Sequence, residues 1–406
     1  ENAQFGYLPD YPLEYQTYFD LQNRPYMRTD AGIATWRAGD WVETVVADAI
    51  TSRPESLEGE RVRLVSTKIA FDADGGIYLP AYCAGSNAIV HSADGGQSFA
   101  LYEVPGARGS VDIDQFSGHN VPEGPPPFVR FRRTKKDPDM RWRSLNDLEL
   151  FVPEMVDDEI VIGDPILITR ACIGLSAHSG IPSSIVSRGD SIYVSWGEAT
   201  DPEEDVPGVP TYVVRYGRAD GTLGEPALIG YGPPANDVHN SPSITMDSAG
   251  DPHVLIGTHG RPFQYSRPLE DGTGWTDPVL SGENLSQTYI GMVCGPDDTI
   301  HVVFRLWRYG EPFPASSHAT LAYQRKKPGQ PWEEPRILVR AAFSEYSVFY
   351  HRLTIDQQGR LFVSYDYWST HWFYRNDRPG DRRAIMMSPD GGDTWKMASN
   401  EDLVGG

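Results

Sequence analysis

Short apolar strands separated by polar turns recur along this chain, and five segments show the pattern clearly. In each segment an apolar strand leads into a turn containing Gly or Asp, and a second apolar or aromatic strand follows. Such alternation around such a turn is typical of an antiparallel β-hairpin. The predicted hairpins are residues 69–79, 184–196, 244–256, 292–304 and 353–365.

The spacing of these hairpins predicts a repeat. Their turns fall at positions 75, 189, 250, 298 and 359, so successive turns are 114, 61, 48 and 61 residues apart. The first interval is about twice the others, which predicts a less regular copy within 100–170. A unit of roughly 57 residues fits about seven times into the chain, and repeats of this length indicate a β-propeller.

We therefore expect an all-β fold, a seven-bladed β-propeller forming a single domain over residues 1–406, with six blades as the alternative. Residues 1–60, which include a further strand pattern at 34–46, are expected to complete the closing blade. Closing the ring in this way would remove exposed sheet edges.

Two short motifs support this fold class. Residues 92–99 and 388–395 both follow the pattern S-x-D-x-G-x-[ST]-[WF], which resembles the Asp-box, or BNR, hairpin of sialidase-like propellers. In such a turn the Asp is expected to accept backbone N–H groups while the aromatic residue packs beneath it. Asp-boxes usually lie on the outer part of a blade, so they indicate a fold rather than a chemistry.

Composition supports many tight turns and restricts the partners. The chain has 40 Gly and 33 Pro without a low-complexity tract, as expected where turns join many short strands. A net charge of −21 argues against nucleic acid as a partner, because phosphate binding needs a basic face. A few local arginines can still bind an anionic substrate.

The cysteine spacing and the length of the apolar runs give no sign of a metal site or a membrane helix. Cys83, Cys172 and Cys294 lack metal-ligand spacing and are expected to be buried free thiols. No apolar run approaches the roughly 20 residues of a membrane helix, so no membrane insertion is expected. The chain begins at Glu1 rather than Met, which suggests that a leader was removed and that the protein is secreted, periplasmic or on the cell surface. A monomer is expected.

Polar and titratable residues gather where the predicted strands begin and end, and in a propeller these ends meet at one mouth. His239 and His259 lie at the two ends of one hairpin, and Tyr289 and Arg305 lie at the corresponding ends of the next. We predict that these four residues are catalytic. Candidates for substrate binding are Asn240, His178, Tyr350, His351, Arg352, Tyr367 and Trp368.

Other polar residues are assigned structural roles. His253 and His301 lie within strands beside apolar residues and are expected to be packed histidines. The basic run at residues 130–136 belongs to a Pro-rich insert at 118–142. We expect this insert to be a solvated charged loop, with recognition of an anionic substrate as the alternative.

The site residues resemble those of one enzyme group. The run beginning His239-Asn-Ser-Pro-Ser, then His259, Thr288-Tyr289 and Arg305, is similar to the BNR-type propeller polysaccharide lyases, the ulvan lyases and related rhamnose–glucuronate lyases. The resemblance implies a seven-bladed propeller with two histidines, a tyrosine and an arginine in its site. It covers residues 175–310, and here the matching stretch begins about 175 residues into the chain rather than near its start.

The predicted reaction is β-elimination at a uronate. Arg305 suits the uronate carboxylate, because its planar fork pairs with both oxygens. Tyr289 and His239 are expected to act as the acid–base pair, and His259 to bind the carboxylate or assist the base. This chemistry needs no cofactor or metal. A structural zinc near Cys294 or His351 is conceivable but has no support from ligand spacing.

Two other functions compete with the lyase. A sialidase-like glycoside hydrolase is suggested by the Asp-boxes, but no set of three converging arginines and no Arg-Ile-Pro signature is evident. A non-catalytic carbohydrate-binding propeller would need aromatic residues but no cluster of two histidines, a tyrosine and an arginine.

Overall fold

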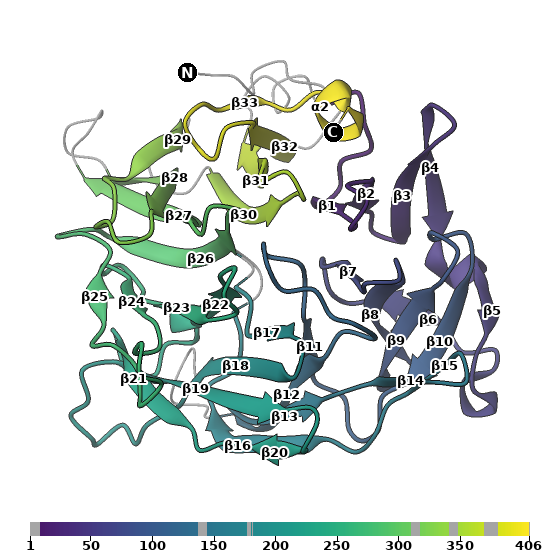
Figure 1. Ribbon diagram of the computed structural model, residues 1–406, viewed down its shortest axis with the longest axis horizontal. Coiled ribbons are helices and arrows are strands. Elements are labelled where there is room, and N and C mark those ends of the chain that lie inside the picture. Colours follow the sequence, from purple (N-terminus) through teal and green to yellow (C-terminus); the bar gives the residue numbers. More distant parts are fainter. Residues whose placement is uncertain are drawn as a thin grey trace.

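The structure is a computed structural model that describes residues 9–136, 144–176, 180, 182–309, 317–340, 348–368 and 381–405. Its described part is all-β apart from short 3-10 turns and one α-helix, α2 (Asn400–Val404). Antiparallel sheets follow one another along the chain and lie around a common centre, with the first and last sheets side by side (Figure 1). No helix in the described ranges is long and apolar enough to span a membrane.

Seven sheets of four or more strands occur in the described residues, together with one two-stranded ribbon. The first sheet contains β1 (Thr17–Phe19), β2 (Pro25–Arg28), β3 (Gly32–Arg37) and β4 (Asp40–Val45). The second contains β5 (Ile50–Ser52), β6 (Val62–Leu64), β7 (Ala70–Phe71), β8 (Ile77–Cys83), β9 (Ser86–Ser92) and β10 (Phe99–Glu103). The third contains β11 (Ser110–Ile113), β12 (Phe128–Lys136), β13 (Ser144–Phe151) and β16 (Ile166–Cys172), and the ribbon is β14 (Glu154–Val156) with β15 (Glu159–Val161).

The later sheets are more regular. The fourth contains β17 (Ile185–Arg188), β18 (Ser191–Gly197), β19 (Val209–Gly217), β20 (Thr222–Leu223) and β21 (Ala227–Gly232). The fifth contains β22 (Ser243–Met246), β23 (Pro252–Ile256), β24 (Gln264–Ser266) and β25 (Val279–Leu280). The sixth contains β26 (Gln287–Cys294), β27 (Ile300–Tyr309), β28 (Ser317–Lys326) and β29 (Arg336–Arg340). The seventh contains β30 (Val348–Ile355), β31 (Leu361–Trp368), β32 (Asp381–Ser388) and β33 (Lys396–Met397).

The predicted hairpins are confirmed. The five strand pairs are antiparallel: β7 with β8, β17 with β18, β22 with β23, β26 with β27, and β30 with β31. The expected irregular copy within 100–170 is the third sheet, whose β11 and β12 are joined by a longer connection. The basic run expected in a solvated loop is instead strand β12, where Arg130 is buried and its Nε lies 2.7 Å from Glu149 Oε2.

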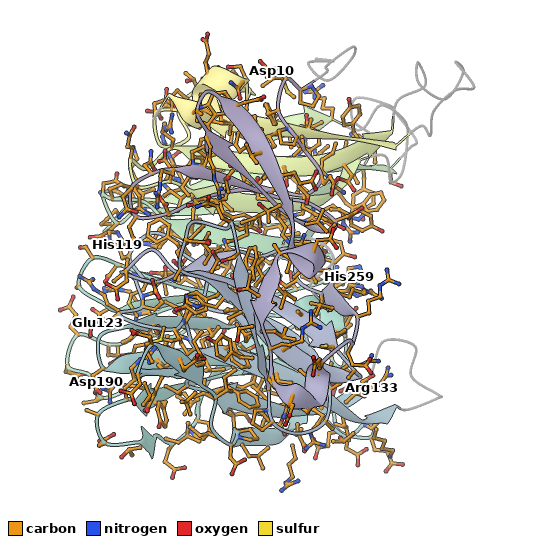
Figure 2. All side chains as sticks on the ribbon, turned by 90° about the vertical axis from the view of Figure 1, so that its right-hand side faces the viewer. Asp10, His119, Glu123, Arg133, Asp190 and His259 are labelled. Atoms are coloured by element: carbon orange, nitrogen blue, oxygen red, sulfur yellow. The ribbon has the colours of Figure 1, made fainter. Side chains whose placement is uncertain are left out.

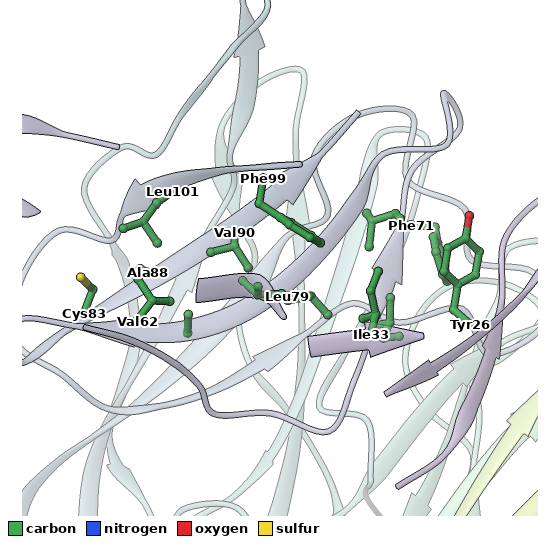
Figure 3. Packing of buried hydrophobic residues seen from close by; sticks show 14 of the residues in the cluster. Tyr26, Ile33, Val62, Phe71, Leu79, Cys83, Ala88, Val90, Phe99 and Leu101 are labelled. Carbon is green, nitrogen blue, oxygen red and sulfur yellow. The ribbon is translucent and has the colours of Figure 1, made fainter. Parts of the chain in front are cut away.

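Among the described residues, seven buried apolar clusters hold the ring together, and each joins two neighbouring sheets. The cluster between the first two sheets packs Ile33 of β3 against Leu79, Val90 and Phe99 (Figure 3). Corresponding clusters join the second and third sheets, and so on around the ring to the sixth and seventh. Burial of apolar area is the main favourable term in folding, so these interfaces form the core.

The seventh cluster closes the ring in a way that the sequence did not predict. Residues 1–60 were expected to complete the last sheet, but β1 to β4 form a sheet of their own. Phe19 and Met27 of this sheet pack against Phe362 of the last sheet and against Leu403 of α2. The ring therefore closes by face-to-face packing, because β2 and β3 satisfy their hydrogen bonds with neighbours in sequence.

Both Asp-box turns have the expected geometry. Asp94 accepts the backbone N–H groups of Gln97 and Ser98, at 2.8 and 3.0 Å. Asp390 accepts the N–H of Thr394 at 2.8 Å. These turns join β9 to β10 and β32 to β33, so they lie in the outer parts of their sheets.

Other predicted structural roles are also confirmed. The three cysteines are buried and free. His253 Nδ1 lies 2.5 Å from the Tyr265 hydroxyl, and His301 Nδ1 lies 2.7 Å from the Tyr323 hydroxyl. Burial lowers the pKa of His301 to about 4, which fits a packed, neutral ring.

A buried carboxyl group between the third and fourth sheets makes stability depend on pH. Asp114 is 1% exposed and accepts hydrogen bonds from Ser187 Oγ and Asn120 Nδ2, at 2.6 and 2.7 Å. Burial raises its pKa to about 7, against the lowering effects of these hydrogen bonds and of Arg218. Between about pH 4 and pH 7 the folded protein therefore binds more protons than the unfolded chain, and stability falls as pH rises through this window.

Replacing Asp114 by asparagine should remove this contribution. We expect Asp114→Asn to gain stability relative to the native protein as pH rises from 5 to 8, by up to about 3 kcal/mol. Urea unfolding at the two pH values measures the change. The exposed Asp205→Asn serves as control and should keep the native pH dependence. Equal pH dependence in Asp114→Asn and the native protein would contradict the prediction.

Candidate active site

A short 3-10 turn, η3 (Val238–Asn240), presents His239 between the fourth and fifth sheets. Asp237 caps this turn, and its Oδ1 accepts the backbone N–H of His239 at 2.9 Å. The Asn240 side chain is fully buried and donates to the carbonyls of Gly232 and Pro234, at 2.7 and 2.5 Å. Asn240 therefore anchors the turn, and its predicted role in substrate binding is not supported by its position.

His259 lies just beyond the end of β23, next to the start of the same hairpin. The close approach requires glycine at position 257, because a Cβ there would lie 2.3 Å from the carbonyl oxygen of Ser241. His259 donates its backbone N–H to Pro233 O at 3.0 Å. Its ring centroid is 4.8 Å from that of His239, so the predicted histidine pair is brought together.

Asp237, which was not among the predicted site residues, joins the two imidazoles. Its Oδ1 lies 2.6 Å from His239 Nδ1, and its Oδ2 lies 2.7 Å from His259 Nδ1. A carboxylate can only accept, so both rings carry a proton on Nδ1 and can offer Nε2 to a substrate. The signal in the sequence was an aspartate two residues before His239.

The environment of Asp237 keeps it ionised. Burial alone would raise the pKa of this carboxyl group, but the hydrogen bonds from His239 and His259 together hold it well below its ordinary value. A permanent negative charge beneath two imidazoles fixes their orientation and stabilises either ring when it takes up a proton.

Tyr289 and Arg305 form the adjoining wall. The Tyr289 ring is edge-on to His239, with centroids 5.5 Å apart, and the guanidinium carbon of Arg305 lies 4.6 Å from the Tyr289 centroid. Arg305 also lies 5.5 Å from the ring centroid of Trp307. Tyr289 and Arg305 are buried, at 7% and 6% exposure, so their charge interactions are weakly screened.

The backbone of Tyr289 is strained. Its φ is +66°, in the left-handed region that aromatic residues rarely adopt, and the pairing of β26 with β27 is irregular between Thr288 and Gly291. His351 Nε2 lies 2.7 Å from the Tyr289 carbonyl oxygen and supports this conformation from the next sheet. Strain that the surrounding structure maintains is typical of functional sites.

The remaining predicted binding residues differ in their placement. Tyr350 has φ +52° in a matching bulge of β30 and is 39% exposed. His351, Arg352 and Tyr367 are buried, at 2%, 6% and 2% exposure, and their role in substrate binding stays a prediction. His178 and the side chain of Trp368 lie outside the described residues.

A groove lies next to His259. It has a volume of about 640 Å³ and is lined by Gly260, Arg261, Asn284, Ser286 and Tyr309, among others. Tyr309 is 69% exposed. Figure 2 shows His259 toward one face of the ring and His119, Glu123 and Asp190 toward the other. His259 therefore lies toward one face of the ring, next to space that fits a sugar ring.

Two groups of described side chains have donor atoms close enough for a metal ion. One is Asp237 with His239 and His259, where the carboxylate already binds both Nδ1 atoms. The other is His119, Cys294 and Asp298, where His119 Nε2 lies 2.9 Å from Gly295 O. Neither arrangement requires an ion to account for its hydrogen bonds.

Comparison with known proteins supports the repeat assignment. Residues 218–405 match the BNR repeat-containing family, which confirms the predicted BNR-type resemblance for this part of the chain. The match includes His239, His259, Tyr289 and Arg305. No curated protein matches the chain.

Similar solved structures include lyases and a hydrolase. An ulvan lyase bound to a glucuronate–rhamnose-3-sulfate oligosaccharide is 14% identical over 54% of this chain and 56% of its own, with a TM-score of 0.39. The polysaccharide lyase Uly1 is 12% identical over 70% and 63%, with a TM-score of 0.40. The Trypanosoma rangeli sialidase is 10% identical over 85% and 56%, with a TM-score of 0.42. The chain thus spans little more than half of that ulvan lyase, and scores below 0.5 define neither fold nor activity.

Proposed function

We propose that this chain, whose residues 218–405 match the BNR repeat-containing family, is a polysaccharide lyase. Its substrate would be a uronate-containing, ulvan-like polysaccharide with rhamnose–glucuronate linkages, outside the cell. The observation that carries the proposal is the single cluster of His239, His259, Tyr289 and Arg305, with both imidazoles bound to Asp237.

The proposed scaffold is a seven-bladed β-propeller in which each sheet of four or more strands is one blade. Support comes from the seven apolar clusters that join neighbouring sheets around the ring. Such a scaffold brings the ends of its inner strands to one mouth, which is where His239, Tyr289 and Tyr350 lie at the starts of successive inner strands.

Arg305 would neutralise the uronate carboxylate. Removing the proton at C5 places negative charge on the C5 carbon and its carboxylate, so a bidentate cation stabilises the transition state more than the ground state. Arg305 is held against Tyr289 and Trp307 in a buried position. Its field would be strong there, because little water screens it.

The proton transfers would fall to Tyr289 and the histidines. The base takes the C5 proton, the C5–H electron pair forms the C4=C5 double bond, the C4–O bond breaks, and the acid protonates the departing oxygen. The products are a 4,5-unsaturated uronate end and a new hydroxyl end. A phenolate at Tyr289 would be stabilised by Arg305, and an imidazolium at His239 or His259 by Asp237.

A sialidase-like hydrolase is the second candidate function. The cluster around Asp237 supports it less than it supports a lyase. Hydrolysis of this kind uses a carboxylic acid and a second carboxylate or a tyrosine as nucleophile. Asp237 has both oxygens hydrogen-bonded to histidines, so it is poorly placed to attack a sugar or protonate a leaving group. A non-catalytic binding protein would have no need for this charge arrangement.

One assay tests the proposed function. Incubation with ulvan should raise the ultraviolet absorbance, because elimination creates a C=C bond conjugated with the carboxylate. Reducing ends should rise in proportion. A neutral polysaccharide serves as control and should give neither signal. Reducing ends without absorbance would establish a hydrolase, and binding without either signal would establish a carbohydrate-binding protein; both results would overturn the proposal.

A further inference from the structure

Three arginine side chains surround the ring of Tyr15 where the first and last sheets meet. The guanidinium carbons of Arg383, Arg352 and Arg28 lie 5.0, 5.5 and 5.6 Å from the ring centroid. They come from β32, β30 and β2, so the cluster exists only when the ring is closed. The expectation that no three arginines converge is therefore wrong.

Only part of this positive charge is paired with a carboxylate. Arg383 binds both oxygens of Asp366, at 2.5 and 2.9 Å. Arg28 is 3% exposed and donates to the carbonyls of Ser66 and Gly32, both at 3.1 Å. Arg28 thus has backbone partners but no ion pair within the described residues.

Arg352 is the least compensated of the three. It is 6% exposed, its Nη1 donates to Tyr350 O at 2.9 Å, and its Nε has no hydrogen-bond partner in the described part of the chain. Burial lowers the pKa of Arg352, and the neighbouring charge of Arg383 lowers it further, against the raising effect of Asp366. Asp366 is the nearby carboxylate, but Arg383 binds both of its oxygens, and an incompletely balanced buried charge is costly. A bound anion would offset that cost.

The arginine cluster neighbours the candidate active site. Arg352 directly follows His351, whose Nε2 lies 2.7 Å from the Tyr289 carbonyl oxygen. Tyr350, near the start of β30, is exposed, and its carbonyl oxygen accepts from Arg352 Nη1 at 2.9 Å. An extended polymer crossing this face can therefore reach both clusters with different sugar units.

We propose that Arg28, Arg352 and Arg383 form a subsite that binds a second anionic group of the polysaccharide, a carboxylate or a sulfate, away from the bond that is cleaved. This inference rests on the proposed function for the identity of the polymer. The anion would approach past the partly exposed Arg383 and Tyr15. Guanidinium groups suit both anions, because their planar donors match two oxygens at once.

The cluster is suited to binding rather than to a second hydrolytic reaction. Tyr15 donates its hydroxyl to Asp30. Burial and this hydrogen bond raise the pKa of Tyr15, and both outweigh the lowering effect of Arg28 and Arg383. A tyrosine kept neutral in this way is a poor nucleophile, although its ring supports the guanidinium groups by cation–π contact.

The first test measures anion binding without reference to catalysis. Sodium sulfate and sodium glucuronate should each be compared with sodium chloride at equal ionic strength, using the thermal midpoint of the purified protein. We expect at least one of the two anions to raise the midpoint above that in chloride, and Arg352→Met to lose most of this increment. In chloride alone Arg352→Met should be at least as stable as the native protein, because a buried charge without an ion pair of its own is removed.

The controls separate binding from folding. Arg352→Lys keeps the positive charge but loses the planar guanidinium group. It should therefore show a smaller anion-induced rise in the thermal midpoint than the native protein. Arg63→Met removes an exposed arginine of β6 and should keep the full increment. No increment for either anion in the native protein, or an undiminished one in Arg352→Met, would overturn the subsite.

The second test uses the polymer. If the chain degrades ulvan, Arg352→Met should raise KM about tenfold or more, with the loss falling mainly on KM, because a remote subsite contributes equally to ground and transition states. An unchanged KM would overturn the subsite while leaving the lyase proposal intact. A chain that binds anions through Arg352 but does not produce unsaturated ends would overturn the lyase proposal and leave the anion subsite standing.

Discussion

Replacing Arg305 by alanine should lower kcat on ulvan by about 10²–10³-fold or more, with the fold unchanged. The guanidinium group is the only cation that the described residues place against the Tyr289 ring. Without it, charge on the uronate carboxylate in the transition state loses its guanidinium partner, and so does a phenolate at Tyr289. Steady-state rates from the ultraviolet assay measure the effect, and circular dichroism and the thermal midpoint check the fold.

Two further variants sharpen this prediction. Arg305→Lys keeps the positive charge but loses the planar fork, and we expect it to recover only part of the native kcat. Arg340→Ala, at the exposed end of the outer strand β29 of the same sheet, should behave like the native protein. If Arg305→Ala keeps more than about a tenth of the native kcat, the neutralising role is wrong.

The four predicted catalytic residues could be identified from the sequence because they are polar residues at the ends of apolar strands. Alternation fixes where a strand begins and ends, and an antiparallel hairpin returns its second strand to the edge where the first began. His239 and His259 therefore had to be neighbours once their hairpin was identified. Tyr289 and Arg305 followed from the next hairpin by the same rule, since β26 pairs Thr288 with Arg305.

The same rule did not reveal how the residues chosen as binding groups are oriented. Asn240 lies beside His239 in sequence, but the 3-10 turn points it inward to the carbonyls of Gly232 and Pro234. In the last sheet a bulge between Phe349 and Arg352 changes the register of β30. Periodicity alone does not reveal such a bulge, because one extra residue exchanges the two faces of a strand.

Long-range features were the least predictable. The arginine cluster combines positions 28, 352 and 383, whose meeting depends on how the ring closes. The sequence suggested that residues 1–60 would join the last sheet. Instead, β1 to β4 pair with one another and form a separate sheet. Strands that are close in sequence pair at a lower entropic cost than distant ones, so the ends of the chain meet through packed side chains instead.

Replacing Asp237 by asparagine should lower kcat by about 10²–10⁴-fold, comparable to the effect of Arg305→Ala. Asparagine keeps one acceptor oxygen but presents an amide donor in place of the other. One imidazole can still donate Nδ1–H, whereas the other must turn its lone pair toward the amide and move its proton to Nε2. That ring can then no longer accept a proton at the nitrogen it offers to the substrate.

Three measurements distinguish this positioning role from a general loss of stability. The nitrogen chemical shifts of His239 and His259 should report Nδ1–H in both rings of the native protein, but in only one ring of Asp237→Asn. The pH–rate profile of the variant should change shape, and not only height, because the imidazolium loses its counter-ion. In Asp237→Ala, added formate should restore part of the activity by supplying a small carboxylate. Unchanged tautomers together with an unchanged profile would show that Asp237 only supports the fold, and the assignment of the histidines as the proton-transfer pair would have to be abandoned.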